Sequence, residues 1–303
     1  MTGYRELRDA AGWLELPGRG KIRMTGEDRV RLLHAMTTNH IQQLTPGTGC
    51  YAFFLTAQGR ILSDVNVFCL PDSLLLDTEP QTAAAVYQHL DHYIIADDVT
   101  LEDLSGQMTT VALEGPKTGA ILAAISAPLP EETYAHLDWR NRRVVRLSET
   151  GFFVFTPVAE KDDLAQELER AGAVAADAEA YRVVQLEQGK PRYGEDISER
   201  FLAQEANQPN ALHFQKGCYL GQEIVERVRS RGQVHRMLMP IEIDSPVEFN
   251  DPPPPGTKLP WGEITSAAFS PALGKVVGLA YVRLEFAKPG TELQLGESHA
   301  RVR

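Results

Sequence analysis

The stretch that decides how this chain is interpreted is Lys216-Gly217-Cys218-Tyr219-Leu220-Gly221-Gln222-Glu223. It sets one cysteine between two glycines, which suit a tight turn because they lack a side chain. Residues 222–231 then predict a helix, with acidic residues early, basic residues late and Gly232 as the stop. Cys218 is therefore expected just ahead of a helix N-terminus and close to a lysine, and both features favour the thiolate. Two interpretations stay open: a reactive thiol, or a small residue in a turn.

Bulk composition indicates a globular protein with room for two or three domains. The chain has 303 residues, of which 43% are hydrophobic and 23% charged, and its net charge is −11. That sign argues against a general nucleic-acid binder. An anionic ligand would need a local basic cluster, and residues 216–236 offer one: Lys216, Arg227, Arg229, Arg231 and Arg236. The alternative is that these arginines only complement the helix dipole and stay solvated.

Cysteine and histidine usage predicts neither a disulfide framework nor a metal site. The three cysteines have no C-x-x-C spacing and are too few for a four-thiolate iron–sulfur site. Cys50 and Cys69 fall in apolar runs typical of buried strands, and the odd count favours a reducing compartment. No apolar run approaches the ~18 residues of a membrane span, and the N-terminus lacks a signal-peptide core. We expect a cytoplasmic protein.

Helical and antiparallel-strand patterns follow one another along the first 230 residues, which predicts an α+β architecture. Helices are expected at 162–170 and 178–187, and a hairpin connects strand patterns at 51–56 and 61–70. After the proline run at 252–255, short strand patterns at 263–267, 276–282 and 292–295 predict a small β-barrel. The domain boundary is placed at 234/235.

The motif K-G-C-Y-x-G-Q-E resembles a signature of the YgfZ-type folate-binding proteins, relatives of the aminomethyltransferase (T-protein) of the glycine cleavage system. Further fragments resemble that family in the same order, so that the likeness runs from about residue 28 to residue 281: residues 59–64, 113–116, 181–197, 265–266 and 270–274. The resemblance implies two α+β lobes that form a folate-binding region at 1–234. It also implies a C-terminal β-barrel at 235–303, with the parts in a cloverleaf arrangement around a folate cavity.

Glu187 is the leading ligand candidate. It ends the predicted helix at 178–187, just before Gly189. One ionised carboxylate can accept both the ring N–H and the exocyclic amino group of a pterin. The family resemblance implies this role, whereas the residues alone favour a solvated glutamate at a helix end.

Asp64 lies on a strand of alternating pattern and is expected to face the N5 or N10 region of the folate. In the transferases the key acid belongs to an Asp-Asp pair at this hairpin, and here the pair reads Ser63-Asp64. If the first position carries the role, this chain has lost it, which argues against aminomethyl transfer. We assign Asp64, with Cys218, to the chemistry.

Four further side chains are assigned to the folate. Arg192 and Tyr193 either line the cavity or belong to ordinary packing. Arg227 is expected to attract the glutamate tail of the folate, and Lys216 is placed on the same basic side.

The resemblance implies a tetrahydrofolate-binding accessory protein that supports iron–sulfur cluster assembly or repair in client enzymes, with Cys218 at the cavity rim. The alternatives are a folate-dependent aminomethyltransferase and a scaffold without chemistry. Fold alone does not separate these functions.

Overall fold

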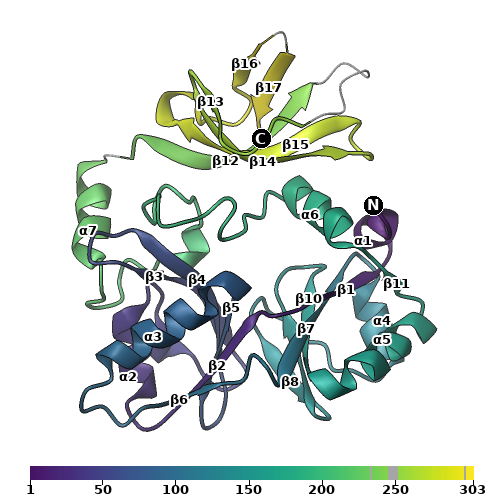
Figure 1. The fold of residues 1–303 in the computed structure, drawn as a ribbon, viewed down its shortest axis with the longest axis vertical. Coiled ribbons are helices and arrows are strands. Elements are labelled where there is room, and N and C mark those ends of the chain that lie inside the picture. Colours follow the sequence, from purple (N-terminus) through teal and green to yellow (C-terminus); the bar gives the residue numbers. More distant parts are fainter. Residues whose placement is uncertain (233, 245–251, 297) are drawn as a thin grey trace. The chain divides into compact units, whose positions relative to one another are not determined.

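The computed structural model describes residues 1–232, 234–244, 252–296 and 298–303 (Figure 1). The chain divides into two compact units. The first unit comprises Met1–Leu55, Leu62–Ala180 and Asn210–Leu220, and the second comprises Thr56–Ile61, Tyr181–Pro209 and Gly221–Arg303. Each unit consists of several separate segments of the chain, so no single boundary describes the division. The boundary at 234/235 stays a prediction.

The first unit contains two sheets, and the larger has six strands in the order β11-β1-β7-β10-β9-β8. All neighbours are antiparallel except β1 and β11. Its strands are β1 Gly12–Leu16, β7 Met108–Glu114, β8 His136–Trp139, β9 Arg142–Arg146, β10 Phe152–Pro157 and β11 Val174–Ala175. Helices α4 (Thr118–Ala124) and α5 (Lys161–Arg170) contribute Leu122 and Leu164 to the core of this sheet.

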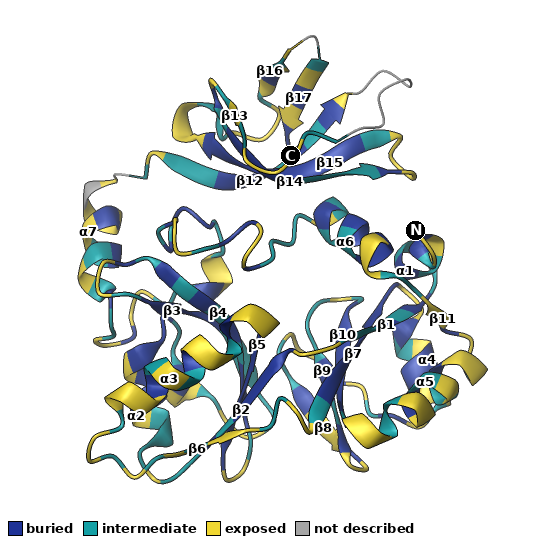
Figure 2. Cartoon of the chain, in the orientation of Figure 1, coloured by how far each residue is buried: buried dark blue, intermediate teal, exposed yellow. Residues whose placement is uncertain are grey.

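The second sheet of the first unit has five strands in the order β3-β4-β5-β2-β6. They are β2 Gly20–Thr25, β3 Gly49–Leu55, β4 Ile61–Cys69, β5 Leu74–Thr78 and β6 Thr100–Asp103. Helices α2 (Arg29–Met36) and α3 (Ala83–Tyr93) bury Leu33 and Leu90 against it and expose their opposite faces (Figure 2). The first unit also contains α1 Tyr4–Asp9 and the 3₁₀ turns η1 Ile41–Gln43, η2 Pro80–Thr82 and η3 Val158–Glu160. Two further 3₁₀ turns are η4 Pro209–Ala211 and, in the second unit, η5 Leu284–Phe286.

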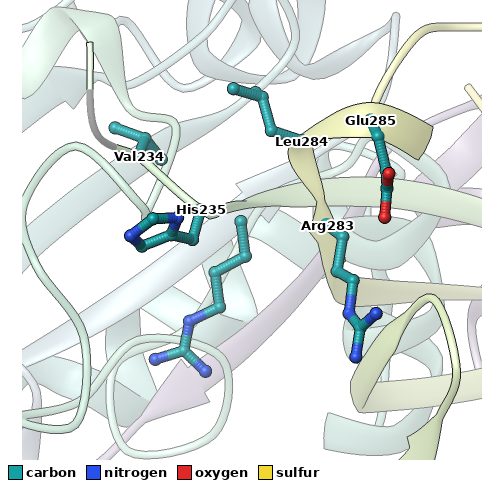
Figure 3. A pocket seen from close by; sticks show the side chains of 6 residues that line it. Val234, His235, Arg283, Leu284 and Glu285 are labelled. Atoms are coloured by element: carbon teal, nitrogen blue, oxygen red, sulfur yellow. The ribbon is translucent and has the colours of Figure 1, made fainter.

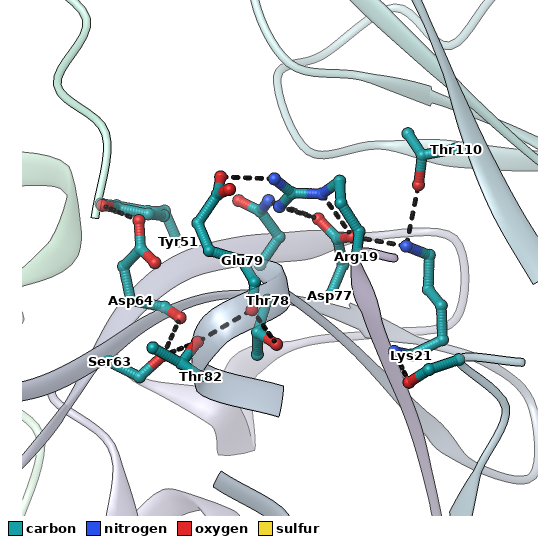
Figure 4. A network of polar contacts seen from close by, with 12 residues as sticks. Arg19, Lys21, Tyr51, Ser63, Asp64, Asp77, Thr78, Glu79, Thr82 and Thr110 are labelled. Carbon is teal, nitrogen blue, oxygen red and sulfur yellow. Dashed lines mark hydrogen bonds and ion pairs between the residues drawn. The ribbon is translucent and has the colours of Figure 1, made fainter. Parts of the chain in front are cut away.

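A buried ionic cluster connects these two sheets (Figure 4). Lys21 of β2 and Asp77 of β5 are fully buried neighbours in register, with 2.6 Å between Nζ and Oδ1. Lys21 Nζ also lies 2.8 Å from the hydroxyl of Thr110 on β7 and 4.6 Å from the ring centre of Phe155 on β10. Since β7 and β10 belong to the six-stranded sheet, one ammonium group bridges both sheets.

The second unit is built on a six-stranded antiparallel sheet in the order β13-β14-β15-β12-β17-β16. Its strands are β12 Arg236–Asp244, β13 Thr257–Leu259, β14 Gly262–Ser270, β15 Lys275–Arg283, β16 Glu292–Leu295 and β17 Ser298–Val302. Ile241, Ile264 and Val282 are at the centre of its core. Two helices complete the chain, α6 Ala178–Glu187 and α7 Gln222–Arg231.

The helices predicted at 178–187 and 222–231 are confirmed at both ends, and Gly232 ends α7 in the left-handed conformation. The predicted strands after residue 255 are parts of β14 and β15 and the whole of β16. β12, β13 and β17 were missed. Among the described residues, none of the helices has the length and apolarity needed to cross a membrane.

Candidate functional site

In the second unit, Glu187 lies at the C-terminal end of α6 and is half-buried. Its Oε1 accepts a hydrogen bond of 2.6 Å from the hydroxyl of Ser270, the last residue of β14. The Ser270 hydroxyl in turn accepts from the backbone N–H of Leu273 at 3.1 Å. Gly189 follows α6 with φ 68°, a conformation that favours glycine, so the chain turns directly after the carboxylate. The carboxylate is therefore fixed against the turn that follows β14.

A second carboxylate fastens α6 to the sheet. Asp196 is fully buried and accepts four hydrogen bonds. The donors are Arg182 Nη2 at 2.5 Å, the backbone N–H of Arg192 at 2.9 Å, Thr265 Oγ1 at 2.7 Å and Ser266 Oγ at 2.5 Å. Arg182 comes from α6, and the two hydroxyls come from β14. One side chain thus positions the helix that carries Glu187 on the strand that carries Ser270.

The structure gives Tyr193 and Arg192 contacts within the second unit. Tyr193 is buried, and its hydroxyl donates to the backbone carbonyl of Ile61 at 3.1 Å. Arg192 is half-buried, and its Nη2 donates to Gln185 Oε1 at 3.3 Å. These contacts support the 188–197 segment, and the assignment of both residues to a ligand stays a prediction.

In the first unit, Asp64 of β4 pairs with Tyr51 of β3 (Figure 4). The Tyr51 hydroxyl donates to Asp64 Oδ2 at 2.9 Å. Ser63 points to the opposite, fully buried face of the strand, where its Oγ lies 2.9 Å from Thr82 Oγ1. The two positions of the Ser63-Asp64 pair therefore have different surroundings, and only the second lies beside Tyr51.

The pKa values of two carboxyl groups of the five-stranded sheet, Asp64 and Asp77, are shifted in opposite directions. Burial and the nearby Glu79 carboxylate raise the pKa of Asp64 to about 7, against the pull of Arg19 and the Tyr51 hydroxyl. Burial would also raise the pKa of Asp77, but Arg19 and Lys21 hold it well below its usual range. Arg19 binds Asp77 with both Nε and Nη2, at 2.9 and 2.7 Å. Asp64 is consequently the carboxyl that can exchange a proton near neutral pH.

Lys216, the first residue of the motif that contains Cys218, is only 2% exposed. Its Nζ donates to the carbonyl oxygens of His34 and of Thr37, the latter at 2.5 Å, and so caps the C-terminal end of α2. Burial lowers the pKa of this ammonium to about 7. Lys216 therefore anchors the loop to α2, and this contact does not support its predicted role as a folate ligand.

Three histidine rings cluster beside this anchor. The ring centres of His34 and His40 are 4.8 Å apart, and those of His40 and His213 are 5.0 Å apart. Burial, followed by the charge of Lys216, lowers the pKa of His34 to about 4. Within the described ranges, no group of three or more His, Cys, Asp or Glu side chains is arranged to hold a metal ion.

The three cysteines have different surroundings. Cys218 is exposed, Cys50 is half-buried in β3, and Cys69 is buried at the end of β4. Burial raises the pKa of the Cys50 thiol to about 12 and also raises that of Cys69. At neutral pH these two thiols are poor nucleophiles, so Cys218 is the cysteine best exposed to a reagent or partner.

The arginines of the predicted basic cluster at 216–236 have different surroundings. Arg227 is exposed on α7 and forms no ion pair with any described residue, while Arg229 lies 3.5 Å from Glu226. Arg236 lies 3.0 Å from Glu205. The side chain of Arg231 is outside the part of the chain that is described. Of this set, Arg227 has the surroundings of a cation available to an anionic ligand.

Two family models match the chain. The GCVT N-terminal domain matches residues 2–216, and the glycine cleavage T-protein C-terminal barrel domain matches residues 238–302. The chain belongs to the glycine cleavage T-protein family. The predicted aminomethyltransferase-like α+β fold with its C-terminal barrel domain is thereby confirmed, and membership of the YgfZ type stays a prediction.

Individual members of the T-protein family show the same likeness at low identity. The chain is 26% identical over 293 residues to the Arabidopsis thaliana protein named "Putative transferase At1g60990, chloroplastic", covering 92% of this chain but only 66% of that protein's length. It is 27% identical to the aminomethyltransferase of Thermosynechococcus vestitus, covering 97% of this chain and 82% of the relative. The crystal structure of the glycine cleavage system aminomethyltransferase T from Bartonella henselae matches with a TM-score of 0.88 at 20% identity, covering 99% and 86% of the two chains.

Some residues of the site escaped the sequence analysis. Ser270 and Asp196 were quoted only as parts of family-like fragments, and the structure shows that these fragments meet through Glu187–Ser270 and Asp196–Thr265. Arg19, Lys21 and Asp77 gave no motif. Their signal was weak: Asp77 is the one charged residue of the strand LLLDT, and Lys21 alternates with Arg23 in the strand GKIRMT.

We predict opposite effects on stability for replacing the carboxyl groups of Asp64 and Asp77. A carboxyl whose pKa is about 7 in the fold and 3.8 when unfolded stabilises the protein below about pH 4, and this contribution is lost as the pH rises to 7. Asp64→Asn should therefore raise the free energy of unfolding at pH 8 by roughly 1–3 kcal/mol, and the gain should vanish near pH 4. Urea unfolding at both pH values measures this.

Asp77→Asn is the matched control, because it removes the same charge from a carboxylate that is paired. It should destabilise the protein at pH 8 by about 3–5 kcal/mol, the cost of breaking a buried pair. If Asp64→Asn destabilises the protein at pH 8 as Asp77→Asn does, the surroundings inferred for Asp64 are wrong.

Proposed function

We propose that this protein binds tetrahydrofolate, or another reduced folate, and that Glu187 holds its pterin end. The observation that carries the proposal is the Glu187 carboxylate, fixed by Ser270 in a chain of the T-protein family. A carboxylate held in one orientation can accept the paired N–H donors of a pterin as a two-pronged hydrogen bond. Half-burial adds discrimination, because a ligand without those donors desolvates the carboxylate and gives it no hydrogen bonds in return.

We further propose that folate binding serves iron–sulfur cluster assembly or repair in client enzymes, in the reducing environment of the cytoplasm. Cys218 supports this, since it is exposed in the K-G-C-Y-x-G-Q-E motif while Lys216 ties the same loop to α2. One exposed thiolate can donate a single ligand to a cluster shared with a partner. It can also attack a partner's disulfide, which frees one partner sulfur as a thiolate and forms a mixed disulfide; a third cysteine of that partner then displaces Cys218 and leaves the partner with a rearranged disulfide. Arg227 is the proposed contact for the glutamate tail of the folate.

A second candidate, folate-dependent aminomethyl transfer, is favoured by Asp64. A carboxyl with a pKa of about 7 suits proton transfer at the reacting nitrogen of a folate. Curated relatives at 25–27% identity are named aminomethyltransferase, which agrees with this chemistry. Single-turnover transfer from an aminomethyl-loaded carrier protein to tetrahydrofolate separates the two functions.

Glu187→Gln should weaken tetrahydrofolate binding by about 1–3 kcal/mol, because the amide replaces one acceptor with a donor that opposes the pterin. Titration calorimetry on both proteins measures the difference. Glu292→Gln is the matched control, since Glu292 is an exposed glutamate of β16 in the same unit, and the affinity of this variant should equal that of the unaltered protein. Equal affinities for all three proteins would remove Glu187 from the site.

Cys218→Ser should leave the fold and tetrahydrofolate affinity nearly unchanged but abolish support of iron–sulfur enzymes in cells lacking the native protein. The reason is that serine keeps the size of the side chain and loses the thiolate. Complementation of iron–sulfur enzyme activity, at matched protein levels, is the measurement. Cys50→Ser is the control and should complement, because Cys50 is held as a thiol inside β3. Full complementation by Cys218→Ser would contradict the proposed mechanism.

A further inference from the structure

The second unit contains a pocket that the proposed folate chemistry does not use. Its volume is about 560 Å³, and it is lined by Val234, His235, Arg236, Arg283, Leu284 and Glu285 (Figure 3). These residues come from the start of β12, the end of β15 and the turn η5. The volume is in the range of sites for small organic molecules.

Two arginines lie opposite each other at this pocket. Arg236 of β12 and Arg283 of β15 are direct partners in the antiparallel register. Like charges in such positions repel each other and destabilise the sheet unless another group compensates them. Arg236 is compensated, because its Nε lies 3.0 Å from Glu205 Oε1 and its guanidinium covers the Phe201 ring at 4.8 Å.

Arg283 lacks such compensation. It is exposed, and the described part of the chain provides it with no ion pair. Glu285 lines the same pocket, yet the two side chains form no ion pair. The exposed ring of His235 adds a third nitrogen-bearing side chain to the wall. A bound oxyanion would balance the positive charge of Arg283, since a guanidinium binds such groups with two parallel hydrogen bonds.

The rest of the pocket is apolar and backed by fixed backbone. Leu284 is 45% exposed, and in Figure 3 it lies with Val234 on the side away from the Arg283 head group. The backbone N–H of Leu284 donates to the carbonyl of His235 at 3.0 Å, and that of Arg283 donates to Trp261 at 2.8 Å. The frame is therefore set by hydrogen bonds, and it offers a cationic wall and an apolar wall to the same ligand.

We propose that this pocket binds the phosphate group of a small phosphate monoester whose organic part is apolar. Arg283, with Arg236 and His235, binds the phosphate oxygens, and Val234 and Leu284 contact the organic group. Inorganic phosphate would make the contacts to the arginines and His235 but not those to Val234 and Leu284. It should therefore bind more weakly than the phosphate monoester.

The test is titration calorimetry of the full chain at constant ionic strength with phenyl phosphate and with inorganic phosphate as probes. Phenyl phosphate should bind one site at least about fivefold more tightly than inorganic phosphate. Arg283→Gln should lower its affinity about tenfold or more, and Glu285→Gln should raise it about threefold because a repelling carboxylate is removed. Arg283→Lys should keep part of the affinity, since it retains the charge and loses the fork.

Arg301→Gln is the matched control, because Arg301 is an exposed arginine of β17 in the same sheet. Its affinity for phenyl phosphate should stay within about twofold of the unaltered protein. Three results would overturn the proposal: no saturable binding of phenyl phosphate, equal affinity for the two probes, or the same loss in Arg301→Gln as in Arg283→Gln.

Discussion

The hydrogen bonds to Asp196 are the constraint on which the second unit depends. A fully buried carboxylate is costly unless every lone pair finds a donor, and here a guanidinium, a backbone N–H and two hydroxyls provide them. Because the donors come from α6, the loop after it and β14, satisfying this one group fixes three segments together. Glu187 and Ser270 owe their contact to the same arrangement, so the candidate ligand group is positioned by a residue that need not touch the ligand.

The first unit also contains two carboxyl groups that are shielded from water, and only one of them is paired with cations. Asp77 is neutralised by Arg19 and Lys21, and Lys21 also reaches Thr110 of the neighbouring sheet, so this ion pair connects the two sheets. Asp64 has Tyr51 for a hydrogen bond and Glu79 as an unfavourable neighbour. The sheet thus keeps one carboxylate ionised for structure and leaves another ready to exchange a proton, a separation typical of acid–base sites.

Local sequence patterns predicted what depends on local chemistry. Helix α6 follows from its apolar positions, and α7 follows from early acidic residues, late basic residues and Gly232; the predicted ends of both were correct. The role of Lys216 could not be predicted in this way. Its partners are the carbonyls of His34 and Thr37, about 180 residues earlier in the chain, and only the folded backbone brings them to the ammonium group. β12 was missed because the domain boundary was placed at 234/235, just before its first residue, and no strand was predicted after it until residue 263. The surroundings of Ser63 and Asp64 likewise depend on the two faces of the strand, and which position carries the acidic role stays a prediction.

The most direct test of the account is hydrogen–deuterium exchange of the full chain with and without saturating tetrahydrofolate. The proposed role of Glu187 predicts slower exchange in the segments at 181–193 and 265–275, which Asp196 and Ser270 hold together. At a subsaturating concentration of tetrahydrofolate, Glu187→Gln should show less slowing in both segments than the unaltered protein. Unchanged exchange in both segments of the unaltered protein, under conditions where tetrahydrofolate binds, would contradict it.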